Sequence, residues 1–263
     1  MLIPNQYCLI NGEALDAVPA RLYTAKANQH ARNLAQSDWL IRDKQSGKYV
    51  ATVKNNSVQF LRRVAGDVQR LEAVNELFSV AMYCANQLRS TSDVLALLNT
   101  LELDVDVYAA SHHLQLVAEP NMLEYAGKDR YQRTLWLEHR TKAAWQRMQR
   151  CAKQDGEILE AISGFRGYHY QMGIFQRKMA RGLTLKDILS VNTAPGFSEH
   201  HSGRAIDISA MGELAAEQSF EQTSAFSWLN TFAGDFGFHL SYPRGNIHGI
   251  CYEPWHWYYQ GND

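Results

Sequence analysis

The sequence lacks several features that would assign it to a class at once. It has 4 cysteines in 263 residues, and they are far apart with no C-x-x-C pair. A chain of this length needs no disulfide staples, and no cysteine zinc site is visible. The formal net charge of -1 offers no basic face to nucleic acid or to an anionic membrane surface. We therefore expect free thiols and no nucleic-acid partner.

Long apolar runs are also absent. No stretch approaches the roughly 18 uncharged apolar residues of a membrane span, so we expect no integral membrane segment. The first residues, M-L-I-P-N-Q-Y, have no basic region followed by a sustained apolar core, so no signal peptide is predicted. The expected location is the cytoplasm, although periplasmic or exported action stays open.

The first part of the chain reads as mainly helical. Two strand-like runs around a Gly-containing loop predict a hairpin over residues 39–53. Apolar residues at three- and four-residue steps predict a helix over residues 57–88. Near residues 103–119 the helical period gives way to extended-looking segments. We therefore expect a mostly helical accessory region of unknown role over residues 1–118.

Residues 119–263 are predicted to form an α+β domain with a mainly antiparallel sheet and flanking helices. Helical and strand-like runs alternate along this part of the chain. A short buried strand over residues 158–162 leads directly into S-G-F-R. An alternating run over residues 250–259 predicts the final strand.

Two polar stretches contain the residue types of a metal site. They are S-E-H-H-S-G-R-A-I-D at residues 198–207 and E-P-W-H at residues 253–256. Hydrolytic zinc takes three protein ligands and keeps one open position, and imidazoles with a carboxylate suit it. Small residues between His200 and Asp207 let two short segments approach one metal. Pro254 cannot donate to a ladder, and the bend it invites would bring the carboxylate and the imidazole of E-P-W-H together.

Each of these side chains also has an ordinary structural explanation. Asp207 would suit a cap or a turn, His256 a hydrogen-bonded place in the core, and Glu253 the surface. The 10 histidines of the chain make chance neighbours of acids common. His200 and His201 should point in different directions, since neighbours on an extended segment diverge.

The order of the motifs resembles one family. S-G-F-R, then S-x-H-x-x-G-x-A-x-D, then E-P-W-H is similar to the VanY-type D-alanyl-D-alanine carboxypeptidases. These are zinc D-Ala-D-Ala peptidases that share a fold with the hedgehog signalling domain. The resemblance runs from about Asp129 to Trp257 and leaves residues 1–118 uncovered. Phe165 and Gly167 depart from the tyrosine and serine common in the family, which leaves the substrate contacts of this loop open.

The resemblance implies one zinc ion per chain, held by His200, Asp207 and His256, with Glu253 as the general base. We predict that His200, and not its neighbour, is the ligand from the H-H pair. Arg166 is implied to bind either the substrate carboxylate or the oxyanion. We also expect the substrate to contact Ser163, Gln171, Ser198 and Trp255.

The implied activity is hydrolysis of the terminal D-Ala of peptidoglycan stem peptides, or of their precursors or fragments, with zinc-bound water as nucleophile. The same site would serve an L,D-carboxypeptidase or a peptidoglycan endopeptidase, and these alternatives stay open. The competing class is a non-catalytic zinc-binding module. The presence of Glu253 favours the enzyme, because such a module would be expected to lose its acid/base first.

Overall fold

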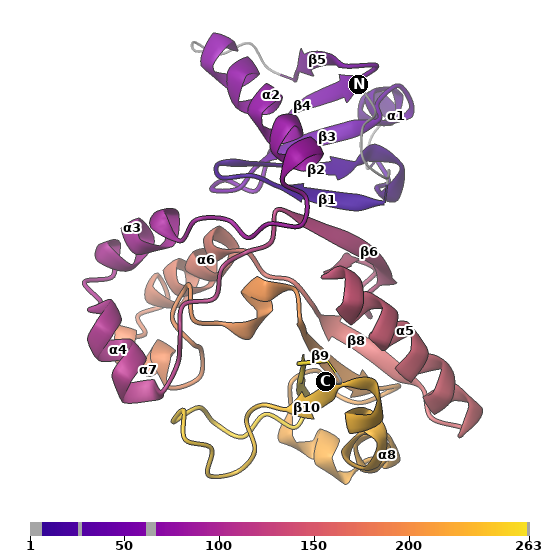
Figure 1. Cartoon of the computed structure of the whole chain (residues 1–263), viewed down its shortest axis with the longest axis vertical. Helices are drawn as coiled ribbons and strands as arrows, with labels where there is room; N and C mark the ends of the chain where they lie inside the picture. Colours follow the sequence, from indigo (N-terminus) through magenta and orange to yellow (C-terminus); the bar gives the residue numbers. More distant parts are fainter. Residues whose placement is uncertain (1–6, 26–27, 62–66, 262–263) are drawn as a thin grey trace. The chain divides into compact units, whose positions relative to one another are not determined.

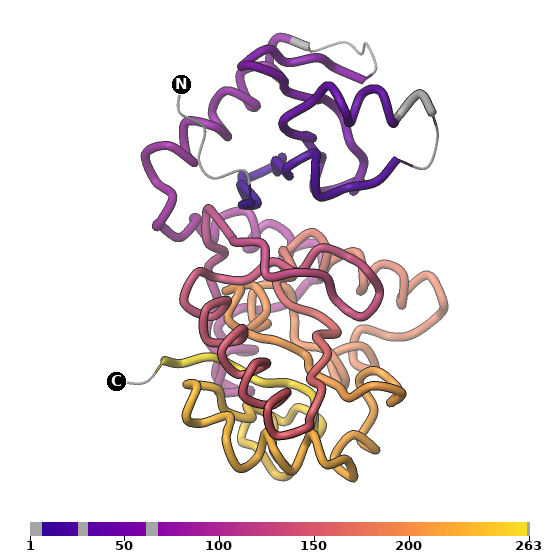
Figure 2. The backbone as a smooth tube through the Cα atoms, turned by 90° about the vertical axis from the view of Figure 1, so that its right-hand side faces the viewer, coloured from indigo at the N-terminus to yellow at the C-terminus, as the bar shows by residue number. Residues whose placement is uncertain are grey.

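The computed structural model of the protein describes residues 7–25, 28–61 and 67–261. The chain divides into two compact units. Unit 1 comprises Met1–Arg89 and Pro120–Tyr125, and unit 2 comprises Ser90–Glu119 and Ala126–Asp263. The elements of each unit can be followed in Figure 1, and the path of the backbone in Figure 2. Within the described ranges, no helix is both long and apolar enough to cross a membrane.

Unit 1 is built on an antiparallel sheet with the strand order β5-β4-β3-β2-β1-β6. Its strands are β1 (Cys8–Asn11), β2 (Leu15–Pro19), β3 (Trp39–Asp43), β4 (Tyr49–Lys54), β5 (Ser57–Phe60) and β6 (Met122–Lys128). Its helices are the short 3-10 helix η1 (Ala20–Leu22), α1 (Asn28–Ala35) and α2 (Asp67–Tyr83). Val74 and Leu77 of α2 pack with Ile10 and Trp39 of the sheet to form the core of this unit.

The predicted hairpin is confirmed as β3 and β4, but the helix predicted to follow it starts too early. Residues 57–60 form β5, in which Val58 lies opposite Val53. A short apolar run fits both a helical and a strand period, and pairing with a neighbouring strand decides between them. A sheet therefore organises unit 1, where the sequence predicted a mostly helical region.

Unit 2 contains a four-stranded antiparallel sheet with the order β10-β11-β9-β8. The strands of this unit are β7 (Thr134–Leu137), β8 (Leu159–Ser163), β9 (Ala205–Ala210), β10 (Phe238–Leu240) and β11 (His256–Tyr259). The α-helices are α3 (Ser92–Thr100), α4 (Val105–His112), α5 (His139–Gln154), α6 (Tyr168–Met179), α7 (Leu185–Leu189) and α8 (Ser224–Phe232). The 3-10 helices are η2 (Glu199–Ser202), η3 (Gln218–Gln222) and η4 (Ala233–Phe236). The α+β class with mainly antiparallel sheets is thus confirmed.

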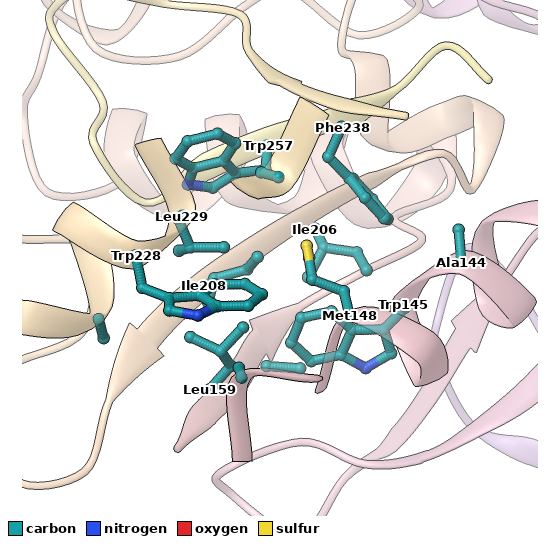
Figure 3. Close-up of a cluster of buried hydrophobic side chains, with 14 of the residues drawn as sticks. Ala144, Trp145, Met148, Leu159, Ile206, Ile208, Trp228, Leu229, Phe238 and Trp257 are labelled. Atoms are coloured by element: carbon teal, nitrogen blue, oxygen red, sulfur yellow. The ribbon is translucent and has the colours of Figure 1, made fainter. Parts of the chain in front are cut away.

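Alternation along β9 sorts its side chains between the two faces of the sheet. Ile206 and Ile208 enter a hydrophobic core with Met148 of α5 and Trp228 of α8 (Figure 3). Asp207 stands between the two isoleucines, so its side chain points to the opposite face. The apolar partners of β9 thereby fix which face of the sheet can carry a polar site.

Helices α3 and α4 belong to unit 2. Val94 of α3 and Tyr108 of α4 share a buried cluster with Tyr168 of α6 and with Phe197. Gly196 allows this approach, because a Cβ added there would lie 2.8 Å from a Val94 methyl carbon. The predicted division after residue 118 therefore differs from the observed one, which places residues 90–119 with the second unit.

The extended segments predicted within residues 103–119 are wrong over Val105–His112, which form α4. Asp104 caps this helix, since its side chain accepts a hydrogen bond from the Val107 N–H. β-Branched residues are uncommon in helices but are tolerated where a cap and tertiary packing support them. The valines that suggested a strand are therefore accommodated in a short packed helix.

Candidate metal centre

Three buried side chains meet where η2, β9 and β11 come together. His200 lies on η2, and Asp207 on β9 stands directly opposite His256 on β11 in the antiparallel register. Asp207 Oδ1 lies 3.2 Å from His200 Nε2 and 3.2 Å from His256 Nδ1. One potential ligand atom from each residue lies within 4.8 Å of the other two. The structure therefore brings together the three residues that the sequence predicted as ligands.

The remaining ring nitrogens are held by hydrogen bonds that orient both histidines. His200 Nδ1 donates to the carbonyl oxygen of Gly164 at 2.6 Å, which leaves Nε2 free to bind a metal. His256 Nε2 donates to Glu199 Oε2 at 2.8 Å, which leaves Nδ1 free in the neutral ring. Such outer partners fix the tautomer and the orientation of metal-binding histidines. The site thus presents two imidazole nitrogens and one carboxylate oxygen toward one point.

The ionisation of the three residues follows from their burial and their contacts. Burial lowers the pKa of His200 to about 4, so this ring is neutral near pH 7. Burial opposes the charge on Asp207, but His200, His256 and Arg166 hold its pKa well below the usual range. Burial also opposes the charge on His256, but hydrogen bonds with Asp207 and Glu199 raise its pKa to about 10. In the metal-free protein, an ionised carboxylate therefore faces one neutral and one protonated imidazole.

Glu253 reaches the same centre because the chain bends before β11. The predicted strand over residues 250–259 is formed only from His256 onward, and the His256 N–H donates to the Glu253 carbonyl oxygen at 3.1 Å. This turn across Pro254 places Glu253 Oε2 3.8 Å from His256 Nδ1. Burial, supported by the negative charge of Asp207, raises the pKa of Glu253 to about 7. A carboxylate with that pKa can both accept and return a proton near neutral pH.

Arg166 approaches the site from the segment after β8. Its Nη1 lies 3.4 Å from Asp207 Oδ2, and its backbone N–H donates to the His200 carbonyl oxygen at 3.3 Å. Its Nε is buried and has no hydrogen-bond partner among the residues the structure describes. The guanidinium therefore keeps donor capacity beside the three candidate ligands.

His201 faces away from the ligand cluster. Its Nδ1 donates to the Arg166 carbonyl oxygen at 2.5 Å, and its Nε2 accepts from the Gly196 N–H at 3.0 Å. Both ring nitrogens are thus occupied, and burial lowers the pKa of the ring to about 4. His201 holds the backbone around Arg166, while His200 joins the cluster.

The four predicted substrate residues lie in different surroundings. Ser163 stands opposite Asp207 at the end of β8, and Ser198 is buried directly before η2. Gln171 is buried, with Nε2 donating to the Thr193 carbonyl oxygen at 3.1 Å and Oε1 unpaired among the described residues. Trp255 packs against the hydrophobic core of unit 2.

Sequence reasoning missed two residues at the site. Glu199 holds His256, and its only signal was its place directly before His200. Tyr242 is buried, and its ring centroid lies 4.8 Å from that of His256. Burial and the charges of Glu199 and Glu253 raise the pKa of the Tyr242 hydroxyl. Its only signal in the sequence is its place at the end of the run F-H-L-S-Y, residues 238–242.

The fold and this cluster define an α+β protein with two buried histidines and one carboxylate that could hold a metal ion, and with an adjacent acid. Residues 134–262 match the family described as VanY, D-alanyl-D-alanine carboxypeptidase. This part of the chain is similar to the VanY-type D-alanyl-D-alanine carboxypeptidases. The match contains all four residues of the cluster and leaves α3 and α4 outside it.

Single relatives also match only part of the protein. The chain is 35% identical over 116 residues to YodJ of Bacillus subtilis (strain 168), and 32% identical over 120 residues to a D-alanyl-D-alanine carboxypeptidase of Enterococcus faecalis. Each alignment covers 42% of this chain, and 41% and 43% of the two relatives. The chain thus spans about two fifths of their length. Among solved structures, the LdcB LD-carboxypeptidase is 30% identical over 51% of this chain and 65% of its own, with a TM-score of 0.48.

Proposed function

We propose that the protein is a zinc-dependent peptidase that removes the terminal D-Ala from peptidoglycan stem peptides or their precursors. The observation that supports this is the meeting of His200, Asp207 and His256 with Glu253 inside the VanY-type region. The residues proposed to form the catalytic domain are those of unit 2, with α3 and α4 included. The proposed cofactor is one zinc ion per chain.

The donor set suits zinc better than the harder cations. Calcium and magnesium prefer sites made of oxygen, whereas two imidazoles and one carboxylate are a familiar set in catalytic zinc sites. The hydrogen bonds from His200 to Gly164 and from His256 to Glu199 are those that metal-binding histidines need. When bound, zinc would lower the pKa of a coordinated water toward about 7 and polarise the peptide carbonyl.

Glu253 is proposed to accept the proton of the attacking water and to return it to the departing amine. Its pKa of about 7 suits both steps near neutral pH. Arg166 is proposed to stabilise the negative charge that develops on the carbonyl oxygen. Its Nη1 lies 3.4 Å from Oδ2 of the candidate ligand Asp207. This position supports stabilisation of the carbonyl oxygen over binding of the terminal carboxylate of the substrate, which lies farther from the metal.

The substrate contacts are proposed from the buried polar atoms near the cluster. Gln171 Oε1 is a buried acceptor that a substrate N–H would satisfy, since an unpaired buried acceptor is costly. Ser163, which pairs with Asp207 across the sheet, and Ser198, two residues before His200, are proposed to contact the substrate backbone. Trp255 remains a predicted substrate contact.

Product analysis on defined muropeptides tests the proposal. The purified protein is stripped of metal with a chelator, reloaded with zinc, and incubated with three substrates: a pentapeptide ending in D-Ala-D-Ala, a tetrapeptide, and a cross-linked dimer. We expect mass spectrometry to detect free D-Ala and tetrapeptide from the pentapeptide only, and only with zinc. D-Ala release from the tetrapeptide alone would instead identify an L,D-carboxypeptidase, and cleavage of the dimer alone an endopeptidase. If the zinc-loaded protein cleaves none of the three substrates, the protein would instead be a non-catalytic zinc-binding module.

A further inference from the structure

Two reciprocal hydrogen bonds join α4 to the loop between β10 and β11. His112 Nδ1 donates to the carbonyl oxygen of His248 at 2.8 Å, and His248 Nδ1 donates to the carbonyl oxygen of His112 at 2.9 Å. A carbonyl oxygen can only accept, so each ring carries a hydrogen on Nδ1. We call this pair of hydrogen bonds the histidine clasp. Both partners lie in unit 2.

The loop that the clasp holds has a site residue at each end. Tyr242 begins it, with its ring against His256, and Glu253 ends it. The Glu253 N–H donates to the Tyr242 carbonyl oxygen at 3.1 Å, which ties the two ends together. Between them, the Asn246 side-chain amide donates to two carbonyl oxygens of the loop, at 3.0 and 2.7 Å. These hydrogen bonds join the two ends of the loop and connect its outer part to them. A displacement of the outer part is therefore expected to move Glu253 as well.

The loop is also linked to the metal site by its rings. The His248 ring meets the Tyr242 ring edge-on, with the centroids 6.0 Å apart. Tyr242 in turn packs on His256, with a centroid distance of 4.8 Å. A continuous set of contacts thus runs from α4 through the clasp to one of the candidate metal ligands.

Helix α4 can serve as a fixed support for this loop. The buried hydroxyl of Tyr108 accepts a hydrogen bond from the Ala194 N–H at 3.1 Å. The Tyr108 ring lies with its centroid 4.8 Å from that of Phe197, three residues before His200. The helix is therefore attached both to the segment that leads to η2 and, through the clasp, to the loop that leads to β11.

We propose that His112 and His248 are positioning residues that hold the Glu253 loop in its working conformation. Helix α4, which lies outside the matched residues 134–262, is then part of the catalytic apparatus. This inference rests on the proposed peptidase function, because it assigns a role to the loop that carries the general base. Opening the clasp should leave the three metal ligands in place, because the two histidines among them are held by hydrogen bonds to Gly164 and Glu199, which lie outside the loop. The clasp should therefore affect the rate of hydrolysis and not the binding of zinc.

The test compares variants of the zinc-loaded full chain in kcat, KM, zinc content and melting temperature. His112→Ala and His248→Ala each remove one of the two hydrogen bonds, and the double variant removes both. His113→Asn is the matched control, because it removes an exposed imidazole from the same helix end and keeps a residue that tolerates the left-handed backbone there. Exchange of backbone amide hydrogens over residues 243–253 is measured in parallel.

We expect kcat to fall about fivefold in each alanine variant and roughly 20-fold in the double variant, which is the scale of one and two ordinary hydrogen bonds. Zinc content and KM should stay close to those of the unaltered chain, and amide exchange in the loop should accelerate. His112→Asn and His248→Asn should recover most of the rate, because an asparagine Nδ2 can donate from nearly the same place as the ring Nδ1. His113→Asn should change nothing.

A folded, zinc-loaded double variant with unaltered kcat and unaltered exchange would overturn the proposal. So would a loss of kcat that only follows a loss of zinc, since the clasp would then support the metal site itself. If the unaltered zinc-loaded protein hydrolyses no stem peptide, the proposed function fails, and loop exchange still decides whether the clasp holds the loop. If the double variant does not fold, His248→Ala alone carries the same comparison.

Discussion

Zinc binding should displace one proton from His256, and that proton can be counted. In the metal-free protein, His200 has a pKa of about 4 and is neutral at pH 6, and Asp207 is ionised. His256 is protonated at that pH, because hydrogen bonds to Asp207 and Glu199 outweigh burial and raise its pKa to about 10. A metal ion that binds Nδ1 must remove this hydrogen.

Glu253 would also release a proton when zinc binds, so this side chain must be replaced if the proton from His256 is to be counted alone. Burial raises its pKa to about 7, so it is largely protonated at pH 6, and a nearby cation would drive this proton off. In a Glu253→Gln variant, only His256 remains to change its protonation. The apparent zinc affinity of this variant should then rise about tenfold per pH unit between about pH 5 and pH 6.5, because one proton competes with the metal and a zinc-bound water is not yet ionised there.

Isothermal titration calorimetry at pH 6, in two buffers with different ionisation enthalpies, measures the number of protons released. This pH lies below the range in which zinc sites ionise water. We expect one proton per zinc in Glu253→Gln and a larger number in the unaltered protein. No proton released and a zinc affinity independent of pH would refute the reasoning, because His256 would then be neutral. Two protons in the variant would equally contradict it, because His200 or Asp207 would have to be protonated.

Three further outcomes are expected. Glu253→Gln should lower kcat by at least about 100-fold with zinc content unchanged, since it removes the proton acceptor but no ligand. Glu199→Gln should weaken zinc binding by about 10- to 100-fold in competition with a chelator, because the carboxylate that orients the ligand on β11 is lost. Gly196→Ala should lower the melting temperature more than Gly212→Ala does. Both glycines have a positive φ, of 89° and 86°, but only at the first would an added Cβ meet other atoms. The difference should correspond to about 1–3 kcal/mol of crowding.

Each of these three predictions would be contradicted by a specific result. Hydrolysis at the full rate in Glu253→Gln would exclude this carboxylate as the base. For Glu199→Gln, the control is Glu221→Gln, which removes a carboxylate paired with Arg244 near the surface, and equal zinc affinities in the two variants would refute an orienting role for Glu199. Equal melting temperatures for the two glycine variants would mean that α3 does not pack closely on this loop.

The three candidate ligands that the sequence predicted lie together in the structure, and their signals in the sequence are local. Alternation in A-I-D-I placed Asp207 away from the core, and the structure has Ile206 and Ile208 in that core. Pro254 indicated the bend that lets Glu253 and the residue three positions later reach one centre. These inferences needed only backbone geometry over a few residues, together with the order of the motifs.

The region before residue 119 was predicted less well because its signals are ambiguous at short range. Val58 fitted a helix until its pairing with Val53 placed it in β5. The valines of α4 suggested a strand, and a cap at Asp104 with packing around Tyr108 made a helix instead. Propensity differs by only a few tenths of a kcal/mol between such states, so tertiary contacts decide.

The sequence by itself determined which residue types are available for a metal site, and in which order they occur along the chain. Only the tertiary structure decided which nitrogen of each histidine is free, because that depends on the Gly164 carbonyl and on Glu199, the latter 57 residues from His256. It also decided that α4 supports the loop of Glu253, since His112 and His248 are 136 residues apart. Contacts between residues so far apart depend on how helices pack on the sheet, and the local pattern of residues does not encode that packing.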